Sequence, residues 1–176
     1  MRCSDHVSPT EELITLALHI CSLIRDIDQT VPADGAYHVV RFPFGDAESS
    51  DAHEMHQIEQ PDGHTIEDWD SESRSGLIWP SVSGWASLTA MIQWESGNYS
   101  ELRDRFVRDP LDLAEGSDST ATDHRPPSPG MQCFTKHHQI FVDPDTPLAL
   151  AVAHDDSSGR RIVHAQFKLA IDDDVA

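Results

Sequence analysis

The sequence predicts a mainly β fold, an antiparallel jelly-roll-like β-sandwich with an N-terminal α-helix. Three observations support this fold class. Apolar and polar residues alternate over several stretches, most clearly over residues 84–94. Turn-forming residues separate about eight such stretches at intervals of roughly 10–15 residues, with no helix between them. The first thirty residues alone show a helical period, so we expect them to form a separate unit.

Residues 1–30 are expected to form an N-terminal helix. Ser8-Pro9-Thr10-Glu11-Glu12 combines a hydroxyl cap, a proline in the first turn and acids at the positive end of the helix dipole. Such a helix would carry a broad apolar face, which either the protein's own core or other copies of the chain must cover. We therefore treat the helix as an anchor or an oligomerisation element. The candidate oligomer interface consists of Leu13, Leu16, Ile20, Leu23 and Ile27.

Residues 36–176 are expected to form the β-sandwich domain. Strands are predicted at 37–44 and 76–80, and acidic, turn-rich residues lie between them. In the strand over 84–94, Ala86, Leu88, Ala90, Ile92 and Trp94 share one face. The segment 99–109 fits a strand or a helix, and its β-rich neighbours favour a strand.

The C-terminal half should contain a long loop and three strands. Residues 110–131 include Pro126, Pro127 and Pro129 and almost no apolar residue after Leu113, which predicts a polar loop that is functional or lies on a neighbouring molecule. Strands are then expected at 132–143, at 148–153 and at the end of the chain. In the last strand, Val163, Ala165, Phe167, Leu169 and Ile171 should point inward.

The charge of the chain excludes two classes of partner. Asp and Glu number 31 against 12 Lys and Arg, which gives a net charge of −19. Nucleic acids and anionic membranes both require clustered cations, so neither is an expected partner. Aspartate is abundant, and Lys136 and Lys168 are the only lysines. This composition is typical of proteins in concentrated salt, where charge repulsion is screened, and it favours a halophilic source. A high-GC bacterial source is the alternative.

Neither the cysteines nor the apolar stretches indicate a zinc site, a disulfide framework or a membrane anchor. Cys3, Cys21 and Cys133 are an odd number without a Cys-x-x-Cys pair. The apolar stretch Leu13–Ile24 is shorter than a membrane span. Glu11 and Glu12 precede it where a signal peptide would carry positive charge, so we expect no cleaved signal.

The eleven histidines do not form a recognisable metal motif. Neighbouring histidines in a strand diverge, so we expect them on the surface or in interfaces and predict no cofactor. The pairs that should diverge are His53 with His56 and His137 with His138. His154 and His164 flank a predicted hairpin and could approach each other, but two ligands without a third make a weak site. Calcium is the alternative, because several turns hold two carboxylates each. These are Asp143 with Asp145, Asp68 with Asp70, and Asp155 with Asp156.

No motif for covalent catalysis is present, so we expect a protein that is not an enzyme. The sequence contains no Gly-x-Ser-x-Gly, no Ser-x-x-Lys and no glycine-rich phosphate loop. Asn98-Tyr99-Ser100 matches the N-glycosylation sequon at an expected turn, which matters only if the chain reaches a glycosylating compartment.

Two blocks of the sequence resemble the tumour-necrosis-factor-like and complement-globular-head-like jelly rolls. The first comprises Gly84–Trp94, Glu101-Leu102-Arg103 and Phe106–Asp109. The second comprises Phe141–His154 and Val163–Ile171, and together they lie within residues 76–172. The resemblance implies trimeric assembly. Tailed viruses use similar domains as heads of fibres, spikes and turrets.

The expected function is therefore that of a virion structural protein of a tailed virus with a halophilic or high-GC host. The chain would be a capsid decoration, a turret or a tail fibre or spike component, with itself (as a homotrimer) and other virion proteins as partners. A carbohydrate-binding module that stacks sugars on Trp79, Trp85 and Trp94 is the alternative. A metal-dependent enzyme is a third possibility.

Overall fold

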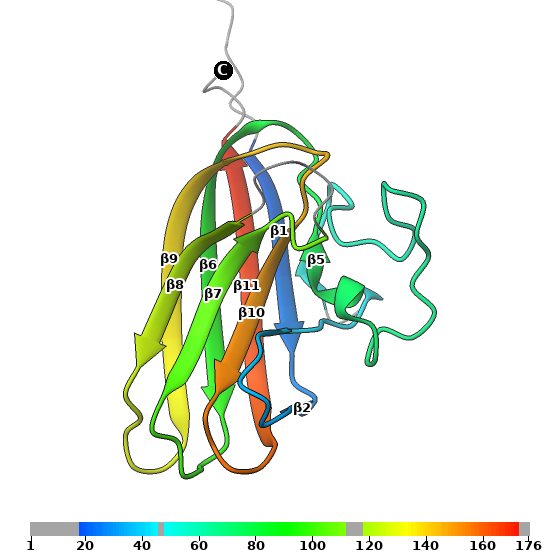
Figure 1. The fold of residues 1–176 in the computed structure, drawn as a ribbon. Coiled ribbons are helices and arrows are strands. Elements are labelled where there is room, and N and C mark those ends of the chain that lie inside the picture. Colours follow the sequence, from blue (N-terminus) through cyan, green and yellow to red (C-terminus); the bar gives the residue numbers. More distant parts are fainter. Residues whose placement is uncertain (1–17, 46–47, 112–117, 173–176) are drawn as a thin grey trace, which may run out of the picture.

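The computed structural model describes residues 18–45, 48–111 and 118–172, which form two antiparallel sheets packed face to face (Figure 1). Sheet A contains β1 (Leu18–Arg25), β2 (Gln29–Val31), β4 (Glu48–Ser50), β6 (Gly84–Trp94), β9 (Gln132–Val142) and β11 (Arg160–Asp172). Sheet B contains β3 (His38–Val39), β5 (Leu77–Ile78), β7 (Leu102–Arg108), β8 (Asp118–Arg125) and β10 (Leu148–His154). The strand order is β4-β1-β11-β6-β9 in sheet A and β3-β10-β7-β8 in sheet B; β2 also pairs with β11, and β5 with β10.

The predicted antiparallel sandwich is confirmed. In β6 the five residues assigned to the inner face are all buried, as strict alternation requires. Every residue of β10 is buried, because this strand lies at the centre of sheet B and both of its faces are covered. The segment 99–109, which fitted a strand or a helix, contains the strand β7.

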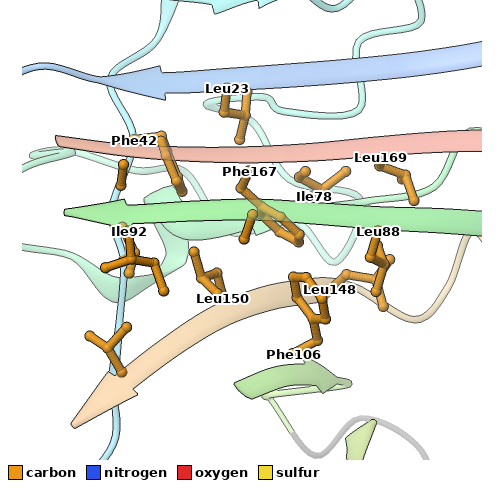
Figure 2. Packing of buried hydrophobic residues seen from close by; sticks show 14 of the residues in the cluster. Leu23, Phe42, Ile78, Leu88, Ile92, Phe106, Leu148, Leu150, Phe167 and Leu169 are labelled. Atoms are coloured by element: carbon orange, nitrogen blue, oxygen red, sulfur yellow. The ribbon is translucent and has the colours of Figure 1, made fainter. Parts of the chain in front are cut away.

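The hydrophobic core lies between the two sheets (Figure 2). Phe167 of β11 stacks on Phe106 of β7, with 5.7 Å between the ring centroids, and lies 6.4 Å from Phe42. Leu88 and Leu150 extend the packing from β6 and β10. Side chains from both sheets thus interlock, which is what an alternating pattern produces when two such faces meet.

The prediction of a helix up to residue 30 is wrong for the described part of that segment. Residues 18–25 form β1, which pairs with β11 over its whole length, from Leu18 opposite Asp172 to Arg25 opposite Ala165. Leu23 therefore lies in the core. The hydrogen bonds and burial that β11 offers outweigh a helical period of only two heptads. Since β1 and β2 belong to sheet A, the predicted domain boundary after residue 30 falls inside the sandwich.

Two further expectations need correction. The predicted loop 110–131 contains β8, a polar strand that pairs with β7 at the edge of sheet B. In β11, a register shift between Ile162 and His164 makes Ile162 the buried residue and leaves Val163 half-buried. An edge strand such as β8 can be held by backbone hydrogen bonds alone, so its sequence need not be apolar. A bulge reverses which side chain points inward, and the alternating pattern of the sequence does not show where it occurs.

A lobe formed by residues 51–76 lies beside the sandwich between β4 and β5 (Figure 1). It ends in the 3-10 turn η2 (Ser73–Gly76). His56 donates from Nε2 to the Ser75 carbonyl at 2.8 Å, and the Arg41 guanidinium donates to the Ser71 carbonyl at 3.1 Å. The first bond joins the two ends of the lobe, and the second attaches the lobe to the segment that follows β3. No helix among the described residues has the length and apolarity to cross a bilayer.

Candidate functional site

The outer face of sheet A, called the A face here, is formed by the outward-pointing residues of its four long strands. Cys21 and Leu23 point into the core from β1, so Leu18, Ile20 and Ser22 point outward. The other outer positions are Trp85, Ser87, Thr89, Met91 and Gln93 of β6, Cys133, Thr135, His137, Gln139 and Phe141 of β9, and His164, Gln166, Lys168, Ala170 and Asp172 of β11, with Ile24 of β1.

The A face is depleted of charge in a chain where 24% of residues are charged. Among the outer positions named above, only Lys168 and Asp172 bear a formal charge, and Arg161 of β11 lies beyond the register shift at the edge of the face. The remaining positions are apolar, small, hydroxyl or amide residues, with His137 and His164 as the titratable exceptions. Depletion of charge at the centre of a surface patch is typical of protein–protein interfaces.

One end of the A face carries a row of exposed large apolar side chains. Leu18, Trp85 and Phe141 lie on one line across the sheet, because Leu18 and Trp85 both pair with Asp172 and Trp85 pairs with Phe141. Their exposed fractions are 56%, 44% and 40%, and that of the adjacent Ile20 is 37%. Large apolar side chains gathered on one face mark an interaction surface more than single exposed residues do.

The predicted oligomer-interface residues are not brought together in one surface. Leu13 and Leu16 lie outside the described residues. Leu23 packs in the protein's own core. Ile20 lies on the A face, and Ile27 is exposed in the turn between β1 and β2 at the other end of the sandwich. An intersubunit role for these residues stays a prediction. Sequence reasoning named Trp85 only as a candidate for stacking sugars, and it missed Phe141; the available signal for both was an apolar residue at an outward position of a strand.

The pairs His53 with His56 and His137 with His138 are separated as expected. The His53 ring stacks on His19 with 3.9 Å between centroids, whereas His56 stacks on Phe44. His137 and His138 point to opposite faces of β9. His154 is buried, and its Nε2 donates to the Val31 carbonyl at 3.0 Å. His164 contacts Asp26 at the edge of the A face.

The acidic turns bond mainly to groups of the protein itself. Asp70 pairs with Arg25 at 2.8 Å, and Asp143 accepts a bond from the Ser83 hydroxyl. Asp155 accepts bonds from the backbone amides of Ser100 and Glu101. Among residues 18–45, 48–111 and 118–172, no group of three or more His, Cys, Asp or Glu residues could hold a metal ion. Calcium binding stays a prediction.

Asp156 links the loops at the end of the sandwich that lies opposite the apolar row. It accepts bonds from the Asn98 amide at 2.6 Å and from the Arg160 Nε at 2.8 Å. The hydrogen bond from the Arg160 side chain is the main cause that lowers the Asp156 pKa to about 2 from 3.8, while desolvation opposes it. Because the folded pKa is depressed, the ionised carboxylate stabilises the fold above pH 3.8, and this contribution is lost as the pH falls toward about 2.

We expect Asp156→Asn to be less stable than the wild type near neutral pH, with the difference shrinking as the pH falls from about 4 to about 2. The amide cannot ionise, so the variant lacks the pH-dependent part of this interaction. Urea denaturation across this range measures both proteins. Asp145→Asn, at an exposed turn, is the control and should stay parallel to the wild type. A constant difference between wild type and Asp156→Asn down to pH 2 would contradict the assignment.

The three candidate stacking tryptophans have different environments. Trp79 and Trp94 are buried, and Trp94 meets Tyr99 and His154 edge-on in the core. Trp85 alone of the three is exposed, on the A face. A sugar could therefore stack only on Trp85 in this arrangement.

A cavity of about 480 Å³ lies beside the lobe, lined by Phe44, Gly45, Asp51, Glu54, His56, Gln57, Ile58 and Glu59. Asp51 uses both of its carboxylate oxygens to accept the backbone amides of Met55 and His56. This acid therefore shapes the loop that forms the cavity wall.

Comparison with solved structures shows which fold this is. The globular domain of zebrafish complement 1qA matches with a TM-score of 0.56 at 15% identity, over 86% of this chain and 94% of that domain. Eiger TNF from S. frugiperda matches with a TM-score of 0.54 at 12% identity, over 89% and 92%. Murine APRIL at pH 8.0 matches with a TM-score of 0.58 at 6% identity, over 88% and 99%.

No protein-family model matches the sequence, and no curated protein matches it. The resemblance to TNF-like and complement-globular-head-like jelly rolls is therefore confirmed as a likeness of fold. At identities of 15% and below, it concerns the fold alone.

Proposed function

We propose that this chain is a non-enzymatic assembly and binding module that self-associates through the A face, with a homotrimer as the favoured state. The observation that carries this proposal is the apolar row of Leu18, Trp85 and Phe141 on an otherwise charge-poor sheet. The chain has 31 acidic residues, yet among the outer positions named above Asp172, the register partner of Leu18 and Trp85, is the only one that is acidic. Covering the face with further copies of the chain would remove these apolar side chains from water.

The energetic gain is large enough to matter. Burying a large apolar side chain completely is worth about 1.5–3 kcal/mol, and Leu18, Ile20, Trp85 and Phe141 are each roughly half exposed. Four such residues on each chain would contribute several kcal/mol per subunit before the entropic cost of association is subtracted. The polar residues of the rest of the face can hydrogen-bond across the same contact.

The finer proposal is a structural role in the virion of a tailed virus with a halophilic or high-GC host. Its support is indirect. The fold is one that such particles display, and the acidic residues concentrate in loops and turns, as expected of a surface hydrated in concentrated salt. In that role the chain would be a capsid decoration, a turret or a fibre or spike component. Location in purified virions by mass spectrometry would test it.

Assembly through the A face can be tested with the double variant Trp85→Asp/Phe141→Asp. The wild type should sediment at a multiple of the 19.6 kDa chain mass, three being favoured, and the variant at the mass of one chain. The physical reason is that two carboxylates cannot be desolvated in an apolar contact. Analytical ultracentrifugation in molar salt measures both masses.

Ile58→Asp is the matched control, because Ile58 is also exposed but lies on the lobe. Its mass should equal that of the wild type. A wild-type mass of one chain, or a double variant that stays oligomeric, would refute assembly through the A face.

A further inference from the structure

The outer face of sheet B, on the opposite side of the sandwich from the A face, carries the densest group of arginines in the chain. Arg103, Arg105 and Arg108 lie within β7. Leu102 and Phe106 are buried in the core, so alternation directs Arg103 and Arg105 outward. The position of these cations is notable in a chain with a net charge of −19.

The two outward arginines are held against one aromatic ring. The Arg105 Cζ lies 3.9 Å from the centroid of the Tyr37 ring, and the Arg103 Cζ lies 5.4 Å from it. Across β10, their register partners are Ala151 and Ala153, whose short side chains leave room for the ring and the guanidinium groups. A guanidinium stacked on a ring uses its flat surface for that contact and keeps its N–H edge for an oxyanion.

The charge of Arg105 is not neutralised within the described residues. Arg103 donates to the Gly35 carbonyl at 3.0 Å and lies 3.5 Å from the Glu101 carboxylate. Arg105 forms no ion pair with any described carboxylate, and its Nε–H is buried without an acceptor. The group is thus fixed in place and desolvated in part. Since the buried Nε–H cannot be reached from outside, a carboxylate of a partner would pair with the terminal N–H groups of Arg105.

The surroundings of Arg105 favour a protein as the source of that carboxylate. On the same side of sheet B, the half-buried Val39 and Leu111 pack on a buried apolar cluster of Leu77, Trp79 and Ala149. A surface that combines arginine, tyrosine and such partly exposed apolar side chains has the composition of a protein interface. Small ligands prefer concave sites instead.

We propose that the outer face of sheet B binds a different protein through an Asp or Glu carboxylate of that partner, which Arg105 holds with its guanidinium fork. Arg103 adds a second positive charge beside it, and Tyr37 keeps the Arg105 plane in position. This contact is independent of assembly through the A face, because the two surfaces lie on opposite sides of the sandwich. Both can be occupied at once.

The test measures the binding of a fluorescent oligo-glutamate peptide to the full chain by fluorescence polarisation. A fluorescent oligo-glutamine peptide of equal length is the reference. The wild type should bind the glutamate peptide saturably and the glutamine peptide at least about tenfold more weakly, which corresponds to roughly one charge-assisted hydrogen bond. Arg105→Gln should lose the preference. Arg105→Lys should not restore it, because an ammonium group lacks the planar fork.

Two further variants separate this geometry from simple charge. Arg161→Gln removes an equal charge from an exposed arginine on β11 and should bind like the wild type. Tyr37→Leu should weaken binding as Arg105→Gln does. Each variant is compared only after its unfolding curve shows a folded chain.

Equal binding of the glutamate peptide by wild type and Arg105→Gln would overturn the proposal. The proposal would also be overturned if wild type and Arg105→Lys bound inorganic polyphosphate equally well. Such a result would indicate that the face attracts any polyanion through its positive charge alone. A change in sedimentation mass in Arg105→Gln would also overturn it, because the occupant would then be a second copy of the chain.

Discussion

Replacing Arg25 with alanine is expected to lower the free energy of unfolding by about 3–5 kcal/mol, the largest effect predicted for a single residue of this fold. The Arg25 side chain is fully buried at the end of β1. Its guanidinium donates to three backbone carbonyls and one carboxylate and lies over the Trp69 ring. The acceptors are the carbonyls of Ile27 (2.6 Å), Asp28 (2.9 Å) and Arg41 (3.1 Å) and the carboxylate of Asp70 (2.8 Å).

The size of this effect follows from what alanine would leave behind. Asp70 is half exposed and can return to water. Carbonyls that remain buried without a donor cost about 1–3 kcal/mol each, and the vacated volume adds a cavity term. Arg25→Lys should recover only part of the loss, because a single ammonium group cannot reach acceptors that diverge around a planar fork.

Urea denaturation measures the Arg25 effect, with Arg161→Ala as the control. Arg161 also pairs with acids, but its side chain is 50% exposed, so its loss should cost less than about 1 kcal/mol. Limited proteolysis should also show faster cleavage in the lobe of Arg25→Ala, since Asp70 and Trp69 lose their attachment to β1. An Arg25→Ala protein as stable as the control would show that the guanidinium contacts are dispensable.

The second large effect is expected at Lys136, which points into the sandwich from the middle of β9. Its ammonium group lies 3.1 Å from the Asp104 carboxylate, also contacts Asp123, and lies 5.5 Å from the centroid of the Phe106 ring. Lys136 and Asp104 are almost completely buried. Arg125 is a second cation at Asp104, 2.9 Å away.

We expect Lys136→Met to lower the free energy of unfolding by about 2–4 kcal/mol, because it leaves the buried Asp104 with only one of its two cations. The double variant Lys136→Met/Asp104→Leu should recover most of that loss, since well-packed apolar residues replace a buried ion pair at little cost. The four proteins of this double-mutant cycle are compared by urea denaturation. Additive losses in the double variant would mean that the two residues do not act as a pair.

Lys136 also has a consequence for assembly. β9 is an edge strand of sheet A and pairs only with β6 among the described strands. An inward-pointing charge on an edge strand disfavours pairing with a further strand. The double variant should therefore be stable yet more prone to aggregate on heating, which light scattering would detect.

The inward-pointing residues were predicted correctly where a strand has one face in the core and the other outside it. β6 and most of β11 have this arrangement, which selects apolar and polar residues in alternation. β10 is buried on both faces and was also predicted as a strand, but two other features were missed. β8 is polar because it lies at a sheet edge, and Ile162 replaces Val163 because a bulge shifts the register.

The segment that contains β1 illustrates the limit of local periodicity. Ile20, Leu23 and Ile27 fit a helical face, but Leu23 and Ile20 point to opposite sides of a strand that β11 completes. Nothing within residues 18–25 records that a thirteen-residue strand from the other end of the chain will pair with them. Contacts between residues so distant in sequence are set by the whole fold.

By itself, the sequence determined that the protein is an acidic, antiparallel β-sandwich of the TNF-like and complement-head-like type, with most of its acidic residues in loops and turns and its apolar residues mainly in strands. These properties are local, because composition and alternation depend only on each residue and its neighbours in the sequence. Only the tertiary structure decided which strands are neighbours. That pairing placed Leu18, Trp85 and Phe141 in one exposed row and stacked Arg105 on Tyr37 on the opposite face. A surface is assembled from strands far apart in the chain, so it exists only once their register is set.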